Sequence, residues 1–455
     1  MILSRLKSFK ASRDGRIALS VLTAFGSKFG GAALQLFALP LVVRSLGVQD
    51  FAIFALSSSI LAFFMFSNLG IGGYLVVLLP SARKSSGREV SAILSNALVT
   101  TISVGLVFIF LLYGYCRIYG LSEVFGGVYD YAPELVVDVL CLVLFFGLLQ
   151  LMISIFISAQ NAYQELYYNN VYGGLGSFAS AVSILIYYNV NPSGNVIAYL
   201  LAFYLPSLFF QILSSIHFVI RHPETCPRFD GMRPSLVRSM IFGGGAFVIA
   251  QTVLPLVIRE VPKLTFASEG ALVDVTTYSL LMVLLSILGG ITLSLTQPMF
   301  GSLSDAWTSG DFLWAIRRVV QITLLFVGMG VVLALIGKIY GEALTTAWVG
   351  AEAAISNHIM FLFGCYFSIN CIFHIFTLSL FVMKLKTACV LVNLSTAVVF
   401  CLLLPFAVSR GVDGVLVVGL LSVGGVGVPL SLLYFYKSLK GFLVDEAALT
   451  SLDLN

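Results

Sequence analysis

Three positively charged side chains lie within or at the ends of long apolar segments, where a charge needs a specific reason. Lys28 lies inside the apolar run 17–43, in a glycine-rich stretch, and Arg44 and Arg259 each end an apolar run. A charge at the centre of a bilayer costs at least about 2.5–3.5 kcal/mol on insertion scales, so such residues usually face a watery cavity. In such a cavity, ammonium and guanidinium groups can bind a phosphate or carboxylate group of a ligand. Alternatively, Lys28 extends to the membrane surface and the arginines complement helix C-termini.

Other polar side chains in the apolar segments form a second group of candidates for the wall of such a cavity. Lys263 follows Arg259 by four residues and is a fourth candidate cation. Further candidates interrupt apolar runs singly, and they are Gln35, Asn68, Gln251 and His374. Histidine titrates near neutral pH, so His374 could couple proton movement, although hydrogen bonding between helices is the commoner role of such residues.

The composition shows which elements must position these side chains. Of the 455 residues, 59% are hydrophobic and 10% are charged, whereas a soluble domain usually carries about 25% charged residues. A membrane-spanning helix needs roughly 20 mostly apolar residues. Segments of this kind predict an all-α polytopic membrane protein with about twelve spans, at 17–43, 51–79, 90–114, 135–158, 166–188, 196–219, 239–258, 275–299, 313–336, 355–383, 387–408 and 413–436.

The same sequence argues against several other classes of protein. The net charge of +4 is too small to indicate nucleic-acid binding, and the seven cysteines show no metal-ligand spacing. The sequence has neither a phosphate-binding glycine loop nor a loop long enough to form a catalytic domain. The run 17–43 is too long for the apolar core of a signal peptide and predicts a retained helix. No metal or organic cofactor is therefore predicted.

The lysines and arginines of the loops predict the orientation of the chain. With the N-terminus in the cytoplasm, 18 of the 25 basic residues fall in cytoplasmic segments, six fall on the opposite side, and Lys28 lies inside a span. The six are Arg44, Arg117, Arg259, Lys263, Lys338 and Arg410. Because the predicted number of spans is even, the C-terminus is also predicted to be cytoplasmic.

A short repeat divides the chain into two similar halves. Leu-Pro-Leu-Val-Val-Arg at 39–44 recurs as Leu-Pro-Leu-Val-Ile-Arg at 254–259, with five of six residues identical. Six predicted spans separate the copies, so both cross the membrane in the same direction. This pattern is typical of transporters built from two bundles related by an axis along the membrane normal. It predicts two six-helix lobes with pseudo-two-fold symmetry, at 1–220 and 221–455.

The segment that follows the first predicted span carries a recognisable motif. It reads Arg-Ser-Leu-Gly-Val-Gln-Asp-Phe-Ala-Ile-Phe-Ala-Leu at 44–56, and Asn-Leu-Gly-Ile-Gly follows at 68–72. Both stretches resemble signatures of bacterial polysaccharide and O-antigen flippases of the Wzx type, in the multidrug/oligosaccharidyl-lipid/polysaccharide exporter superfamily. The chain departs from the pattern at Ala52, where glycine is common, and at Asn68, where the family has an acid. A further departure is Arg259, Glu260 and Lys263 in place of a frequent aspartate-lysine pair.

The resemblance implies a transporter in the bacterial inner membrane that moves a polyprenyl-pyrophosphate-linked oligosaccharide from the cytoplasmic to the periplasmic leaflet. It also implies alternating access through a cavity between the lobes, driven by an H⁺ or Na⁺ gradient or by the membrane potential. The implied partners are the lipid-linked oligosaccharide, membrane lipids and other glycan-assembly proteins.

Two alternatives stay open. One is an ion-coupled exporter of small molecules from the same superfamily, and the other is a membrane polysaccharide polymerase. No Asp or Glu lies deep in a predicted span, which favours an anionic substrate over a cationic drug. A polymerase would need a larger loop to present catalytic groups.

Overall fold

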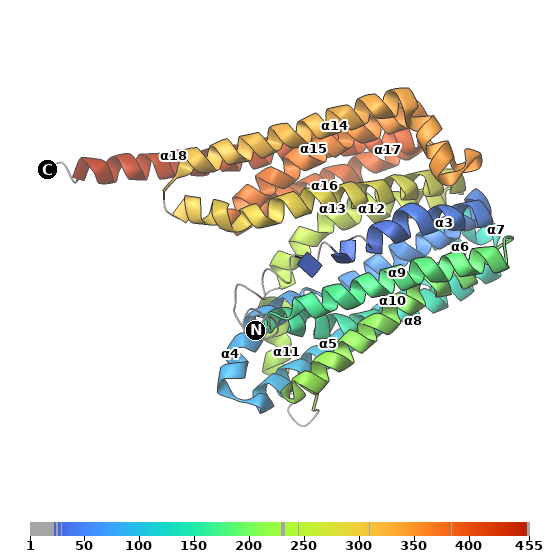
Figure 1. Ribbon diagram of the computed structural model, residues 1–455, viewed down its shortest axis with the longest axis horizontal. Coiled ribbons are helices and arrows are strands. Elements are labelled where there is room, and N and C mark those ends of the chain that lie inside the picture. The colour runs from blue at the N-terminus through green and yellow to red at the C-terminus, as the bar shows by residue number, and fades with distance from the viewer. Residues whose placement is uncertain are drawn as a thin grey trace, which may run out of the picture. The chain divides into compact units, whose positions relative to one another are not determined.

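The computed structural model describes residues 22–23, 26–28, 30–228, 233–243, 245–308, 310–383 and 385–452. Within this part of the chain all regular secondary structure is helical (Figure 1). Its α-helices are α3 (Leu39–Phe66), α4 (Ile71–Ser85), α5 (Gly87–Tyr119), α6 (Leu121–Phe125), α7 (Gly127–Tyr131), α8 (Pro133–Ala162), α9 (Leu166–Val190), α10 (Val196–Arg221), α11 (Pro234–Gly243), α12 (Gly245–Ser268), α13 (Leu272–Thr308), α14 (Phe312–Val349), α15 (Asn357–Val382), α16 (Lys386–Val408), α17 (Gly411–Gly419) and α18 (Val428–Leu452). The same residues include π-helices η1 (Leu34–Ala38) and η5 (Leu420–Gly427) and 3₁₀ turns η2 (Pro223–Thr225) and η4 (Ala351–Ala353).

Ten of the described segments are long and apolar enough to cross a membrane. They are 26–66, 87–119, 133–162, 166–190, 196–221, 272–293, 312–349, 357–382, 386–408 and 411–440. The chain is therefore an all-helical polytopic membrane protein, as its composition predicts. The predicted span 239–258 falls on α11 and the first part of α12, and neither helix is among the ten. The number of crossings therefore stays a prediction.

A single glycine divides the first of these segments. At about 1.5 Å per residue, the 41 residues of 26–66 would extend ~60 Å, about twice the ~30 Å thickness of the hydrocarbon core. Within α3, Gly47 has φ 72° and ψ 177°, which lie outside the helical region. The chain therefore changes direction at Gly47, between the predicted spans 17–43 and 51–79.

The second predicted span is itself interrupted. Helix α3 ends at Phe66, and Leu69 (φ 49°) and Gly70 (φ 71°) lead into α4 through left-handed backbone conformations. The prediction of one continuous helix over 51–79 is wrong for this reason. Hydropathy did not reveal the turn because Leu69 and Ile71 keep the segment apolar.

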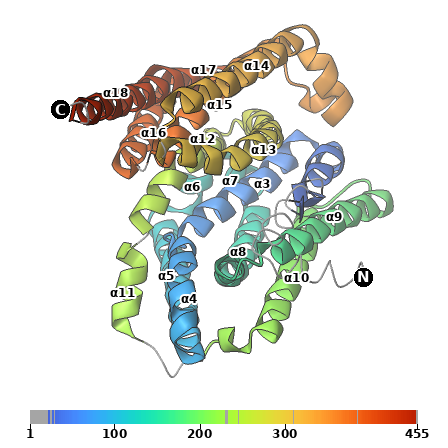
Figure 2. The ribbon, with the colours of Figure 1, turned by 60° about the vertical axis from the view of Figure 1, so that its left-hand side comes forward.

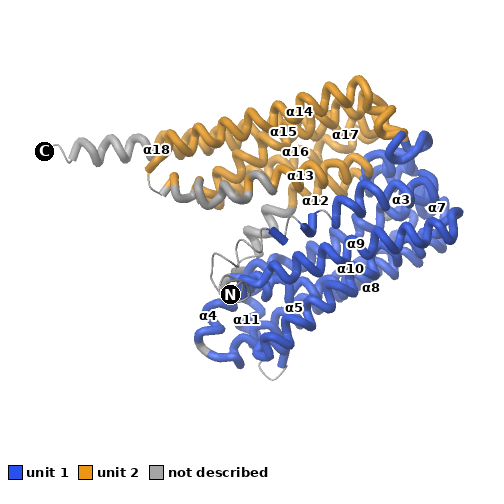
Figure 3. The backbone as a smooth tube through the Cα atoms, in the orientation of Figure 1, with its two compact units in different colours: residues 1–249, 263–279, 347–353 blue, residues 250–262, 280–346, 354–455 orange. Residues whose placement is uncertain are grey.

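The chain forms two compact units (Figure 3). Unit 1 contains residues 1–249, 263–279 and 347–353, and unit 2 contains 250–262, 280–346 and 354–455. In unit 1, buried apolar side chains of α4, α5 and α8 form a core together with Met240 of α11. Helix α11 lies beside α5 (Figure 2). In unit 2, α15 packs against α16, η5 and α18. The predicted lobes at 1–220 and 221–455 stay a prediction.

The connection between α10 and α11 is bound to α5 by buried polar side chains of unit 1. Ser91 Oγ donates to the Cys226 carbonyl at 2.7 Å. Ser95 Oγ donates to the Arg228 carbonyl and accepts from the Arg228 N–H, each at 2.7 Å. Asn96 Oδ1 accepts from the Arg233 N–H at 2.9 Å. The described part of this connection is therefore fixed to the first turns of α5.

The Gly47 break gives a test of the fold. Gly47→Ala should destabilise the protein by about 1–3 kcal/mol, because φ 72° with ψ 177° is a backbone conformation that is essentially restricted to glycine. A Cβ at Gly47 would meet no atom within 4 Å, so the cost would be purely conformational. The measurement is thermal unfolding of the detergent-purified protein. Gly114→Ala, at an equally open helical position, is the matched control and should not lower the midpoint.

Candidate functional site

A cavity inside unit 2 brings together two of the residues selected from the sequence. It is a half-open pocket with a volume of about 330 Å³, lined by residues of α12, α13, α15, α16 and η5. Arg259 and His374 both line it. The other lining residues that carry polar side chains are Thr292, Tyr366, Asn370, Cys371, Thr377 and Asn393. The volume lies at the lower end of the range of small-molecule sites.

The polar groups of this cavity have defined partners. Arg259 Nη2 donates to Ser286 Oγ at 2.7 Å, and the Arg259 side chain is otherwise exposed. Asn370 Nδ2 donates to the hydroxyl of the buried Tyr366 at 2.9 Å. His374 Nε2 lies 3.4 Å from Thr296 Oγ1. These contacts fix the lining groups in place.

The described residues that line the cavity carry a positive charge and no negative charge. None of the described residues that line it is acidic, and Arg259 is its fixed positive charge. A guanidinium has five N–H donors in a planar fork, which matches the oxygen atoms of phosphates and carboxylates. With an exposed guanidinium and no acidic side chain among its described lining residues, this cavity suits an anionic group better than a cationic one.

Arg44, the other arginine of the repeat, has a different environment in unit 1. Its Nη2 donates to the carbonyls of Ala347 and Trp348, at 2.8 and 3.1 Å. These residues belong to the last turn of α14, whose carbonyls lack helical donors, and a cation there also complements the helix dipole. The structure therefore places Arg44 at the C-terminal end of a helix other than its own.

The remaining candidate cations also lie in unit 1. Lys263 is 4% exposed, and its Nζ donates to Ser58 Oγ at 3.4 Å. Lys28 is half-buried near the beginning of the described chain. The structure therefore does not gather the four predicted cations at the unit 2 cavity, since Arg259 alone among them lines it.

Two of the candidates with neutral side chains, Asn68 and Gln35, also lie in unit 1. Asn68 Nδ2 donates to Ser154 Oγ of α8 at 3.1 Å, which is the hydrogen bonding between helices that is common for such residues. Gln35 lies half-buried in η1. The side chain of Gln251 lies outside the described residues.

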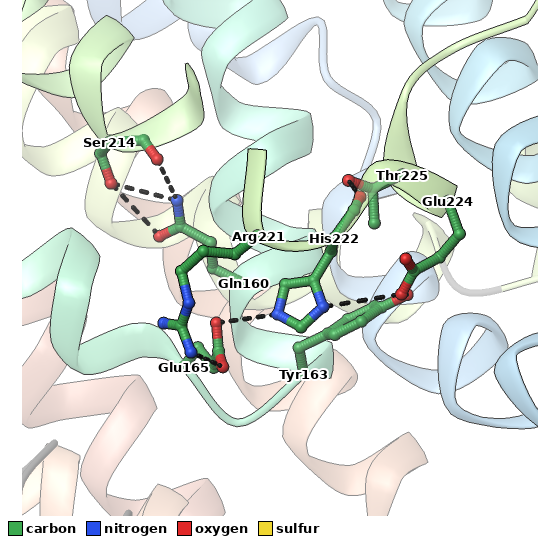
Figure 4. A network of polar contacts seen from close by, with 8 residues as sticks. All are labelled: Gln160, Tyr163, Glu165, Ser214, Arg221, His222, Glu224 and Thr225. Atoms are coloured by element: carbon green, nitrogen blue, oxygen red, sulfur yellow. Dashed lines mark hydrogen bonds and ion pairs between the residues drawn. The ribbon is translucent and has the colours of Figure 1, made fainter. Parts of the chain in front are cut away.

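A polar network that sequence reasoning missed lies at the ends of α8 and α10 (Figure 4). Glu165, 7% exposed, accepts from Arg221 at 3.2 Å and lies 3.1 Å from His222 Nε2. Glu224 lies 3.6 Å from the other ring nitrogen of His222 and accepts from the Tyr163 hydroxyl at 3.2 Å. No spacing rule links these residues, because 57 positions separate Glu165 from His222.

The network ties the turn between α8 and α9 to the start of the connection that follows α10. Burial and the neighbouring Glu224 carboxylate hold the pKa of Tyr163 well above its usual range, against the opposing effect of Arg83. The Arg83 guanidinium lies 4.5 Å from the centre of the Tyr163 ring, and Arg221 stacks similarly on Tyr168. Tyr163 therefore stays a neutral donor to Glu224, and we regard the network as structural.

No family model matches the chain. A Yersinia pseudotuberculosis protein named "Putative O-antigen export protein" is 20% identical over 293 residues, which span 62% of this chain and 64% of that protein. Among solved structures, the lipid II flippase MurJ in an inward closed conformation matches with a TM-score of 0.70 at 15% identity, over 94% of this chain and 89% of MurJ.

A second solved structure is also similar to this chain in its fold. An inward-facing multidrug resistance MATE family transporter of the MOP superfamily matches with a TM-score of 0.67 at 9% identity, over 92% of this chain and 99% of that one. The chain therefore shares the fold of these two solved structures. The predicted resemblance is therefore confirmed at the level of the fold. The matching proteins are transporters and not enzymes, which argues against the polymerase alternative.

The network around Glu165 gives a stability test. Glu165→Gln should destabilise the protein by about 2 kcal/mol, because it removes the anionic partner of both Arg221 and His222. The measurement is the thermal unfolding midpoint in detergent. Glu342→Gln, at an exposed position of α14, is the matched control. An unchanged midpoint for Glu165→Gln would show that the network contributes nothing to stability.

Proposed function

We propose that this chain flips a polyprenyl-pyrophosphate-linked oligosaccharide from the cytoplasmic to the periplasmic leaflet of a bacterial inner membrane. The observation that carries the proposal is the unit 2 cavity, in which the Arg259 guanidinium has no acidic neighbour among the described lining residues. The distant similarity to an O-antigen export protein and the fold shared with a lipid II flippase support a lipid-linked glycan as cargo.

The proposed architecture has twelve crossings in two six-helix lobes, at 1–220 and 221–455, with both termini in the cytoplasm. The Gly47 break supports it by dividing segment 26–66 into two stretches of suitable length. The hexapeptide at 39–44 and its copy at 254–259 support a pseudo-two-fold axis along the membrane normal.

In the proposed mechanism, Arg259 receives the pyrophosphate or an acidic sugar of the cargo. Asn370 and Tyr366 provide neutral hydrogen-bonding groups in the same cavity. His374 is the group there best suited to couple transport to H⁺, because imidazole titrates near neutral pH. Lys28 and Lys263 are secondary cations along the path of the anion, and other glycan-assembly proteins supply the cargo.

A second candidate function is the export of small molecules coupled to H⁺ or Na⁺. The fold shared with a multidrug resistance transporter is the observation that favours it. The charge of the substrate separates the two functions, since a cationic drug would be repelled by Arg259.

Arg259 therefore provides the test of the cargo. Arg259→Gln should reduce export of surface glycan roughly tenfold or more, because a hydrogen bond to a charged group contributes about 1.5–3 kcal/mol. Arg259→Lys should retain part of the activity, since it keeps the charge but loses the planar fork. The measurement is surface glycan in cells whose export depends on this chain.

The matched control is Arg318→Gln, an exposed arginine of α14 that does not line the cavity. Its export should equal that of the unmodified protein at equal membrane abundance. Normal export by Arg259→Gln would contradict the anionic site, and improved export of a cationic drug would favour the second function.

The proposed orientation has an independent test by cysteine labelling after replacement of the seven native cysteines. Arg228→Cys should be protected from a membrane-impermeant thiol reagent in intact cells, whereas Asp130→Cys should react. Both positions are exposed in the structure, so burial does not explain a difference. The reverse pattern of labelling would overturn the orientation.

A further inference from the structure

An apolar groove lies on unit 1 between α8 and α10, two of the segments that are long and apolar enough to cross a membrane. The groove is open to its surroundings and has a volume of about 340 Å³. Its walls are four residues of α8 between Leu149 and Phe156 and five residues of α10 between Ile212 and Ile220. Ser215 is the only polar side chain among these described residues, and its Oγ already donates to a backbone carbonyl of its own helix at 3.0 Å. The groove therefore offers a ligand apolar contact alone.

The α10 wall of this groove presents a stripe of exposed isoleucines. Ile212, Ile216 and Ile220 are 37%, 49% and 71% exposed, and they recur every four residues, so they lie along one side of the helix. A contiguous apolar surface of this kind marks a site of interaction with a membrane or an apolar ligand. Because α8 and α10 are apolar enough to cross a membrane, the chemistry that fits this groove is a hydrocarbon chain.

The length of the groove matches one leaflet of a bilayer. At ~1.5 Å per residue, its α8 wall rises about 10 Å from Leu149 to Phe156, and its α10 wall rises about 12 Å from Ile212 to Ile220. One leaflet contributes ~15 Å of hydrocarbon, half of the ~30 Å core. Helix α10 ends at Arg221, directly after Ile220, so the groove begins at this end of the helix. An ordinary acyl chain fits this length, whereas a long polyprenyl chain would extend well beyond it.

Two exposed arginines lie where the groove reaches the end of α10. Helix α10 continues into η2, which packs against both α10 and α5. Ser91 of α5 holds this connection through its bond to the Cys226 carbonyl. Arg88 lies one turn before Ser91 on the same side of α5. Arg228 follows Cys226 by two residues, and its backbone is bonded to Ser95. Both arginine side chains are exposed.

The charges of these two arginines are not neutralised by the acidic side chains nearby. Glu165 pairs with Arg221, and Glu224 lies against a histidine and a tyrosine (Figure 4). Among the described residues, neither Arg88 nor Arg228 forms an ion pair with a carboxylate. Guanidinium groups match the oxygen atoms of a phosphate. An apolar groove that ends at two such groups has the chemistry that complements a lipid with an anionic head.

We propose that this groove binds an anionic phospholipid, with an acyl chain between α8 and α10 and the phosphate at Arg88 and Arg228. Basic pockets beside membrane helices bind anionic headgroups in this way. The lipid is a resident of the membrane and not the transported cargo, so the inference does not depend on the proposed function. Because it contacts α8, α10 and the junction of η2 with α5 together, the bound lipid stabilises unit 1.

The test is lipid binding to the delipidated protein in detergent, measured by native mass spectrometry. The probes are phosphatidylglycerol and phosphatidylcholine with identical acyl chains, so that only the headgroup differs. Arg88→Gln should weaken phosphatidylglycerol about fivefold, and Arg88→Gln with Arg228→Gln should weaken it at least about tenfold, because each basic residue near a membrane surface contributes a factor of about five. Arg88→Lys keeps the charge and should keep most of the affinity. Phosphatidylcholine has no net charge and should be affected much less.

The groove is tested by filling it. Ile216→Trp and, independently, Ile212→Trp should each weaken both lipids at least about fourfold, the effect of removing one methylene group from apolar contact. Matched controls are exposed positions of α14, at which Arg318→Gln and Leu324→Trp should leave both affinities unchanged. Equal affinities of the unmodified protein for the two lipids would overturn the proposal. Unchanged affinities in the groove and arginine variants, with unfolding midpoints equal to those of the controls, would also overturn it.

Two competitors and the unfolding midpoint of the unmodified protein test the identity of the ligand. Phosphatidylglycerol should raise the midpoint more than phosphatidylcholine does, and this measurement needs no variant that could fail to fold. Inorganic phosphate should not displace phosphatidylglycerol, since it has no chain; displacement would show a site for anions only and overturn the lipid. Tighter binding of a polyprenyl phosphate than of phosphatidylglycerol, lost in Ile216→Trp, would assign the groove to an isoprenoid chain and overturn the phospholipid.

Discussion

The structure depends on one constraint: in a bilayer, each backbone polar group and each charge must find its partner within the protein. Helices satisfy most of this requirement, and the exceptions occur where a helix is broken, ends or contains proline. The described chain meets these exceptions with side chains from distant segments. Trp348 bonds a carbonyl beside Pro40, and Arg44 bonds the end of α14. Similarly, Ser91 and Ser95 bind the backbone that follows α10.

The membrane class of the protein could be predicted from its sequence because hydropathy is a local property. Most predicted spans coincide with helices, and the family resemblance agrees with the fold observed. The turn at Leu69–Gly70 was missed, because a left-handed backbone leaves no mark on hydropathy. The break near Gly47 falls between the predicted spans 17–43 and 51–79, although the glycine responsible was not identified from the sequence.

The candidate site was predictable in part. Arg259 was identified as a charge that ends an apolar run and His374 as a polar interruption of one, and the structure places both at one cavity. The Glu165–His222 contact was not predictable, since neither residue interrupts an apolar span and no periodic spacing joins them. The two arginines of the repeat show a further limit. The hexapeptide is nearly identical in both copies, yet Arg44 bonds a helix end and Arg259 lines a cavity, because the surroundings of each copy differ.

The hydrogen bonds between the first helix and the end of α14 join residues that lie far apart in the sequence, and this has a consequence for biogenesis. Arg44 and Ala347 are 303 residues apart, and Leu36 and Trp348 are 312 apart. At ribosomal rates of roughly 5–20 residues per second, Trp348 is synthesised about 15–60 s after Leu36. During that interval the first helix resides in the membrane with neither of these contacts made. The nascent chain must therefore rely on water, lipid headgroups or the insertion machinery to solvate this region until most of the protein has been made.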